Sequence, residues 1–172
     1  MLLKRILSVA AMALAPLAMS SSPASADIND PYGAVRHPSY KCLTPKGNAT
    51  SNGTVITVWT CTGADGRGDW LQMWRWTSSG ELIHRASGKC LTPKGNSAEN
   101  GAELTLWTCT GSPVQRWKYY ESSSTGIKGI RGADSWKFVT PSGANVANGV
   151  HITQWDWMEH GSQNWYYSDV SV

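Results

Sequence analysis

The chain has 172 residues, with 15 Lys and Arg against 12 Asp and Glu and a formal net charge of +3. Two of the basic residues, Lys4 and Arg5, precede an apolar run from Ile6 to Met19, which is too short for a comfortable membrane span. Together with the small-x-small pattern Ala24-Ser25-Ala26, they predict a secretory signal peptide over residues 1–26, of bacterial type. Residues 27–172 then carry thirteen basic and twelve acidic residues, a balance that argues against nucleic-acid binding and membrane insertion.

Three markers recur at a regular spacing along residues 27–172. The segment Lys41–Pro45 (KCLTP) returns as Lys89–Pro93 and, altered to KFVTP, as Lys137–Pro141, so each step is 48 residues. The same step separates Trp59, Trp107 and Trp155, and a Gln-x-Trp motif closes each unit at Gln72, Gln115 and Gln163. Repeats of one supersecondary unit bury a shared core. We therefore predict one domain over 27–172, with units at about 33–79, 80–127 and 128–172.

Each unit has the pattern of an all-β fold. Residues 54–61, 102–109 and 150–157 are rich in β-branched and aromatic side chains, and each segment follows an Asn-Gly pair that is typical of a tight turn. Alternation places Ile56 and Val58 on a core-facing side, opposite Thr57 and Trp59. Gln154 stands where the other units have Val58 and Leu106. The third unit is therefore either looser at this point or holds a hydrogen-bonded side chain there.

The four cysteines fall at equivalent places in the first two units. Cys42 and Cys61 are 19 residues apart, as are Cys90 and Cys109, so we predict these two intra-unit disulfides. A zinc site is the weaker alternative, because there is no Cys-x-x-Cys spacing and no histidine recurs beside the cysteines. In the third unit Phe138 and Trp157 occupy the matching positions, and we expect their rings to pack in place of a bridge.

The units differ mainly in their loops. The strand Trp and the closing Gln are 59 and 72 in the first unit, but 107 and 115, then 155 and 163, in the others. Five additional residues therefore lie within Gly63 to Trp70, and the second unit is lengthened over Glu121 to Ala133. Variable loops on a repeated core are common places for recognition.

These markers resemble the ricin B-type lectin domain, which also occurs as a carbohydrate-binding module of bacterial polysaccharide-degrading enzymes. The resemblance covers about Gly33 to Tyr167 and rests on Cys-Leu-x, the Asn-Gly turn, Trp-x-Cys and the closing Gln-x-Trp. It implies a β-trefoil of twelve strands with pseudo-threefold symmetry. Within that fold the Trp of Gln-x-Trp is expected to be structural, and its Gln to satisfy nearby backbone groups.

The resemblance also implies where a sugar would bind. In sugar-binding members an Asp lies two residues after the first Cys, a polar side chain lies two before the strand Trp, that Trp stacks on the sugar, and an Asn precedes the closing Gln. This chain keeps the Trp in every unit and has Thr at the Asp position, where the side chain offers one hydroxyl and no charge. The third unit is the least altered, with Thr140, Thr153, Trp155 and Ser162. The other candidates are Thr44, Thr57 and Trp59 in the first unit and Thr92, Thr105 and Trp107 in the second.

The leading interpretation is a secreted carbohydrate-binding protein that recognises a polysaccharide or cell-surface glycan, alone or docked to a larger secreted protein. We predict no catalysis, cofactor or metal site, because His37, His84, His151 and His160 do not recur as a set. The acids Asp65, Asp69, Asp134 and Glu159 fit solvated loops better than a glycosidase pair. The alternative is a β-trefoil interaction subunit or inhibitor-like binder that has lost sugar binding. Its contacts would come from Gly63 to Trp70, Glu121 to Ala133 or Asp27 to Pro31.

Overall fold

The computed structural model describes residues 32–63 and 68–169, which form an all-β domain. The predicted leader, residues 27–31 and the middle of the inserted loop at 64–67 lie outside the described residues. The described part contains twelve strands and five single-turn 3-10 helices, with no α-helix. None of its helices is long and apolar enough to cross a membrane. The strands are β1 (Tyr32–His37), β2 (Lys41–Pro45), β3 (Ile56–Thr60), β4 (Met73–Trp76), β5 (Leu82–His84), β6 (Cys90–Pro93), β7 (Leu104–Trp107), β8 (Trp117–Glu121), β9 (Lys128–Gly132), β10 (Phe138–Pro141), β11 (Ile152–Trp155) and β12 (Tyr166–Asp169).

Six of the strands close into a barrel. β12, β1, β4 and β5 pair in that order, and β8 pairs with β9, all antiparallel. The bridge between Glu81 and Arg116 joins β5 to β8, and a backbone hydrogen bond from Trp165 to Lys128 joins β12 to β9. A closed barrel leaves none of these strands as a free edge.

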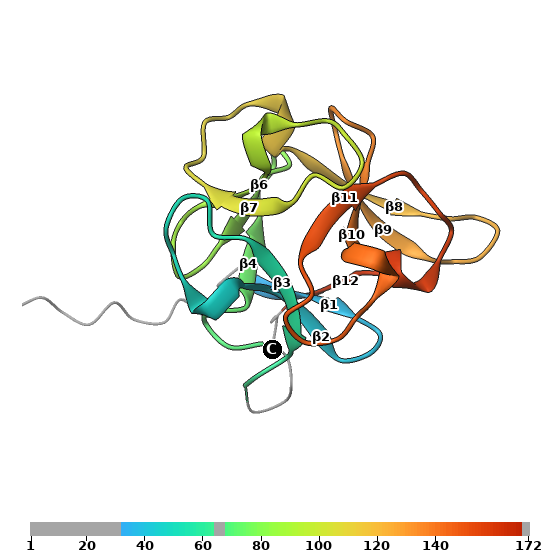
Figure 1. Cartoon of the computed structure of the whole chain (residues 1–172), viewed down its shortest axis with the longest axis horizontal. Coiled ribbons are helices and arrows are strands. Elements are labelled where there is room, and N and C mark those ends of the chain that lie inside the picture. Colours follow the sequence, from blue (N-terminus) through green and yellow to red (C-terminus); the bar gives the residue numbers. More distant parts are fainter. Residues whose placement is uncertain (1–31, 64–67, 170–172) are drawn as a thin grey trace, which may run out of the picture.

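The other six strands form three hairpins that cap the barrel: β2–β3, β6–β7 and β10–β11. In Figure 1 the three units follow one another around a common centre, with β3, β7 and β11 facing it. Their tips are tied in a ring by the Asn-Gly turns. The amides of Gly53, Gly101 and Gly149 donate to the carbonyls of Leu106, Gln154 and Val58 at 2.8, 2.9 and 2.8 Å. Each turn thus bonds to the strand of another unit, and the predicted threefold arrangement is confirmed.

The Gln-x-Trp motifs join the barrel to the cap. Trp74, Trp117 and Trp165 are almost fully buried, and their ring nitrogens donate to the carbonyls of Leu43, Leu91 and Val139 at 3.0–3.1 Å. The glutamine before each Trp is buried too. Gln72 Nε2 donates to the Thr60 carbonyl at 3.0 Å, and its Oε1 accepts from the Thr62 amide at 2.7 Å. The motif is therefore structural, as the sequence predicts.

The covalent and aromatic ties within the units also match expectation. Disulfides join Cys42 to Cys61 and Cys90 to Cys109. In the third unit the rings of Phe138 and Trp157 pack with their centroids 4.5 Å apart, and Tyr120 contacts both edge-on. An aromatic cluster thus occupies the place of a third bridge.

Gln154 resolves the open question about the third unit. Its side chain is fully buried, and Nε2 donates to the carbonyls of Ser97 and Glu99 at 2.7 and 3.2 Å. Its Oε1 accepts from the Ser135 hydroxyl at 3.1 Å. The third unit is therefore not loose at this position, because the amide is hydrogen-bonded across the boundary with the second unit.

Candidate functional site

The three strand tryptophans lie at equivalent places on the surface. Trp59, Trp107 and Trp155 end β3, β7 and β11 and are 46%, 46% and 40% exposed. Each ring lies against an Asn-Gly turn from a different unit. A Cβ added to Gly149, Gly53 or Gly101 would meet Cζ3 of Trp59, Trp107 or Trp155 at 3.7, 3.9 or 3.4 Å. One side of each ring is thus supported by protein, while a large part of it remains open.

The threonines at the family's Asp position are buried and hydrogen-bonded within the fold. Thr44, Thr92 and Thr140 are 3–4% exposed. Their hydroxyls donate to the carbonyls of Cys42, Cys90 and Phe138 at 2.8–3.1 Å. In turn they accept from Nε2 of the closing Gln72, Gln115 and Gln163, at 2.9 Å in every unit. The hydroxyl proton of each threonine is therefore directed to the main chain.

The second set of threonines follows the same pattern. Thr57, Thr105 and Thr153 are buried, and their hydroxyls donate to the carbonyls of Thr44, Thr92 and Thr140 at 2.9–3.1 Å. Ser162 is also buried, and its hydroxyl lies 2.9 Å from Nδ1 of His160. These predicted site residues lie beneath the strand tryptophans as a hydrogen-bonded layer, and each hydroxyl oxygen keeps some capacity to accept.

A pocket of about 260 Å³ beside Trp59 contains a carboxylate that comes from the inserted loop. Asp69 lines it together with Thr44, Thr57, Thr62 and Gln72 from below and Lys46, Asn48 and Gly149 from the rim. Asp69 Oδ2 accepts from the Thr62 hydroxyl at 2.7 Å, and Oδ1 accepts from the Leu71 amide at 2.9 Å. The insertion thus brings an acid into the first unit, where the expected Asp is replaced by Thr44.

The third unit has a pocket of the same volume, about 260 Å³, but of different character. Trp155 and Met158 line it with Thr140, Thr153, Gly101 and the turn from Pro141 to Ala144, and no charged residue is among them. Ser162 is not part of this lining. In the second unit Trp107 is as exposed as Trp59, but its loop lacks the five additional residues that carry Asp69.

The remaining acids that the sequence offered as a catalytic pair lie in unrelated surroundings. Asp65 falls outside the described residues. Asp134 lines a different depression from Asp69, and Glu159 accepts hydrogen bonds from the hydroxyls of Ser122 and Ser124. Those hydrogen bonds lower the pKa of Glu159 below its usual value. Among the described residues, no group of three or more His, Cys, Asp or Glu is placed to hold a metal ion.

Two of the histidines occupy equivalent positions that the regular spacing of 48 did not show. His37 and His84 are buried at the ends of β1 and β5. Nε2 donates to the carbonyl of Gly161 from His37 at 2.8 Å and to that of Leu71 from His84 at 3.0 Å. Burial lowers the pKa of both imidazoles, so both are held neutral. The turn after His37 is one residue shorter, which breaks the exact offset between them.

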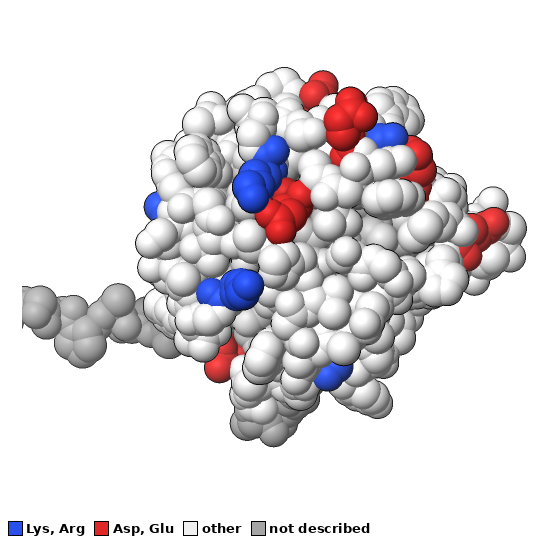
Figure 2. All heavy atoms as spheres, viewed as in Figure 1, with Lys and Arg blue, Asp and Glu red and all other residues white. Residues whose placement is uncertain are grey.

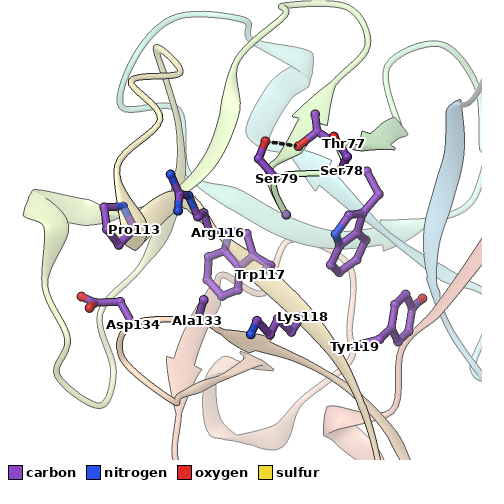
Figure 3. Close-up of a pocket in the computed structure, with 12 residues that line it drawn as sticks. Thr77, Ser78, Ser79, Pro113, Arg116, Trp117, Lys118, Tyr119, Ala133 and Asp134 are labelled. Carbon is purple, nitrogen blue, oxygen red and sulfur yellow. Dashed lines mark hydrogen bonds between the residues drawn. The ribbon is translucent and has the colours of Figure 1, made fainter.

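The largest depression lies at the mouth of the barrel, away from the strand tryptophans (Figure 3). It has a volume of about 490 Å³ between the Thr77–Gly80 turn and β8, with Trp76 and Tyr119 at one side and Asp134 at the other. The rings of Trp76 and Tyr119 stack with centroids 5.1 Å apart, and burial raises the pKa of the Tyr119 hydroxyl. Both follow a Gln-x-Trp tryptophan by two residues, which places them in one layer of the barrel.

The charged side chains on the face shown in Figure 2 are scattered rather than gathered by sign. One network spans all three units at the cap. Glu103 accepts from Lys94 at 2.8 Å and contacts Nδ1 of His151 at 2.7 Å, and Lys46 lies 3.3 Å from the other ring nitrogen of His151. These contacts connect the hairpins without forming a site of one charge.

Comparison with solved structures places the fold among β-trefoils. A designed threefold-symmetric protein, ThreeFoil, is 23% identical with a TM-score of 0.73, covering 82% of this chain and all of that one. An exo-beta-1,3-galactanase from Clostridium thermocellum is 22% identical with a TM-score of 0.71, and the agglutinin from Abrus precatorius is 18% identical with a TM-score of 0.68. The matches cover 83% and 81% of this chain but only 31% and 49% of those proteins. No curated protein sequence matches the chain.

The family comparison agrees with the geometry. Residues 31–168 match the model of the ricin-type beta-trefoil lectin domain, which covers the barrel, the cap and all three strand tryptophans. The chain belongs to the ricin-type beta-trefoil lectin domain family.

Proposed function

We propose that this protein is a secreted carbohydrate-binding protein that holds a polysaccharide or cell-surface glycan in shallow pockets beside its strand tryptophans, without catalysis of its own. Family membership supports the general function, and the lectins among its structural neighbours, such as the agglutinin from Abrus precatorius, are consistent with it. The two disulfides suit an oxidising, extracellular compartment.

The observation that carries the proposal is the presence of Trp59 and Asp69 in one pocket of the first unit. An open indole face provides a flat apolar surface for the ring of a sugar, and the carboxylate accepts charge-assisted hydrogen bonds from sugar hydroxyls. The protein uses one hydrogen bond to each Asp69 oxygen. Because a carboxylate offers about four lone-pair sites, two acceptor sites remain for a ligand. Asp69 thus supplies the charge that Thr44 does not.

The third unit is proposed as a second, more apolar site. Trp155 and Met158 give it ring and methyl contacts, while Thr140 and Thr153 offer only hydroxyl oxygens at its base. Trp107 is the proposed platform of a third site, above Thr92 and Thr105. Several weak sites on one domain raise the avidity for a repeating polymer if they engage it together.

The inward direction of all six threonine protons favours a second candidate, a β-trefoil interaction subunit without sugar binding. In that case the exposed Trp70 of the inserted loop is an available anchor, with the Arg85 guanidinium 4.5 Å from its ring centroid. The two candidates differ in whether the strand tryptophans are needed.

The test is binding of oxidised residues 27–172 to a panel of soluble glycans and insoluble polysaccharides. Single variants Trp59→Ala, Trp107→Ala, Trp155→Ala and Asp69→Asn are compared with wild type, and Asp134→Asn serves as a control acid outside these pockets. We expect Trp59→Ala and Asp69→Asn each to weaken binding by about tenfold or more, because each removes about 1.4 kcal/mol or more of contact energy. Trp155→Ala should lower the avidity for polymers, and Asp134→Asn should change neither quantity.

A glycan hit that all three tryptophan variants retain would move the site elsewhere and contradict the proposal. A blank across the panel from folded protein would favour the interaction subunit. Thermal unfolding of each variant, and a conservative Trp59→Tyr variant that keeps an aromatic face, separate loss of the site from loss of the fold.

A further inference from the structure

Three equivalent turns, each just before the conserved Lys of a cap hairpin, share one backbone conformation. Tyr40, Gly88 and Trp136 occupy the last position, with φ of 59°, 64° and 60°. Their amides donate to the carbonyls of His37, His84 and Gly132 at 3.0, 2.8 and 3.2 Å. Glycine enters this left-handed region without steric cost, whereas bulky residues are strained there. The first and third units therefore carry a large aromatic residue where the second shows that glycine suffices.

Burial does not offset this strain. Tyr40 is 72% exposed and Trp136 is 65% exposed, more than any of the strand tryptophans. The protein contact that the Tyr40 turn needs, from the Cys61 amide to the Tyr40 carbonyl at 3.1 Å, uses only the main chain. Strained residues that are not held by packing often mark functional positions.

An arginine accompanies the aromatic residue in the same two units. Arg36 pairs with Cys42 across β1 and β2, and Arg131 pairs with Phe138 across β9 and β10. The equivalent residue of the second unit, opposite Cys90, is Ile83. Arginine and aromatic residue thus occur together twice and are absent together once. This pattern within one chain indicates a joint role.

The third unit shows how the two side chains meet. The Arg131 guanidinium lies over the Trp136 ring, 4.1 Å from its centroid. Lys118 is directly opposite Arg131 on β8, an arrangement of like charges that destabilises a strand pair unless an anion binds. In the described part of the chain, neither Lys118 nor Arg131 forms a salt bridge, and Arg131 Nε is buried without a hydrogen-bond partner.

The nearby acids do not neutralise this cluster. Asp156 is bonded to Lys137 at 2.6 Å. Asp134, in the turn before Trp136, is exposed and lies at the far side of the barrel-mouth depression from Trp76, with Lys118 between them (Figure 3). It has no ion-pair partner among the described residues.

We propose that Trp136, Arg131 and Lys118 form a subsite for an acidic sugar residue, a pyranose that bears a carboxylate or a sulfate ester, and that Tyr40 and Arg36 form a second one. The aromatic ring stacks on the apolar face of the sugar, and the guanidinium and ammonium groups bind its anionic group. These subsites lie at the turns before β2 and β10, outside the pockets of Trp59 and Trp155. They therefore do not depend on the proposed neutral sites.

The test measures calorimetric binding of oxidised residues 27–172 to oligogalacturonate and, separately, to a chondroitin sulfate oligosaccharide, with a neutral galactan oligosaccharide as comparison. Trp136→Gly should lower the affinity for an acidic oligosaccharide at least tenfold, while the thermal midpoint stays level or rises because strain is removed. Arg131→Gln should weaken acidic binding to a similar extent, and added salt should reduce it further. Lys89→Gln, beside Gly88 in the second unit, is the matched control and should bind like wild type.

A gain-of-function variant makes the test reciprocal. Ile83→Arg with Gly88→Trp should lower the thermal midpoint and add acidic-sugar affinity to the second unit. If Trp136→Gly lowers the midpoint instead, Trp136→Asn, which tolerates this φ, replaces it.

The proposal is overturned if wild type binds neither acidic oligosaccharide, or if Trp136→Gly and Arg131→Gln bind them as wild type does. Binding of only one oligosaccharide assigns the anionic group as carboxylate or sulfate. Failure here leaves the neutral sites untouched, since those are tested by Trp59→Ala with uncharged glycans.

Discussion

The Thr92 hydroxyl accepts a hydrogen bond from Gln115 Nε2 at 2.9 Å, and the same distance separates the equivalent atoms in the other two units. The position where sugar-binding relatives would carry an Asp is here part of the scaffold, because the threonine joins the cap hairpin to the Gln-x-Trp motif. This relationship explains how a lectin fold is kept after the acid is lost.

Thr92→Val should destabilise the protein. The change leaves the Cys90 carbonyl without its hydroxyl donor and removes one of two acceptors from Gln115, both in a buried environment. We expect a loss of about 1–3 kcal/mol in the free energy of unfolding, measured by urea denaturation. Thr50→Val, at an exposed position, is the control and should shift it by less than about 0.5 kcal/mol. Equal effects of the two changes would show that the bond does not matter.

Stability should fall as the pH is lowered through the mid-acid range. Burial lowers the pKa of His37 and His84 in the folded protein below the ordinary value of 6.5, so the unfolded chain takes up protons first. The contribution of the neutral rings is complete above about pH 6.5 and is lost as the pH falls toward the folded pKa. The thermal midpoint should be lower at pH 5.5 than at pH 7.5, and His84→Gln should reduce this difference. His160→Gln, at an exposed residue, should leave it unchanged.

Ala144→Asn should stabilise the third unit. Ala144 has a φ of 54°, whereas Asn48 and Asn96 occupy the equivalent left-handed position of the other units with φ of 57°. Asn tolerates this region better than Ala, and we expect a gain of about 1 kcal/mol in unfolding free energy. Ala147→Asn, at an exposed position of ordinary φ on the same loop, is the control. A gain in both variants would point to a general effect of Asn rather than relief of strain.

Removing the disulfide of the second unit should cost about 3 kcal/mol, because it closes a loop of about twenty residues in the unfolded chain. The double variant Cys90→Ser with Cys109→Ser tests this by chemical denaturation. Glycan binding attributed to Trp59 should survive in the folded variant, since Cys42–Cys61 of the first unit is unaffected. A loss below about 0.5 kcal/mol would mean that the cap hairpin constrains these residues without the bond.

The sequence by itself determined the threefold repeat, the strands, the disulfide pairing and the structural role of Gln-x-Trp. Those features follow from local rules that act alike in every copy: alternation, turn chemistry and a shared period. Phe138 and Trp157 could be expected to pack for the same reason, because they stand where two units have a cystine.

Only the tertiary structure decided which groups share a pocket. Asp69 enters the pocket of Trp59 because an inserted loop folds back, and no period predicts the path of an insertion. The support of Trp59 by Gly149 comes from another unit, since the hairpin tips interlock around the axis. The direction of the threonine hydroxyls was equally hidden, because a proton is given to whichever carbonyl the packed strands bring near it.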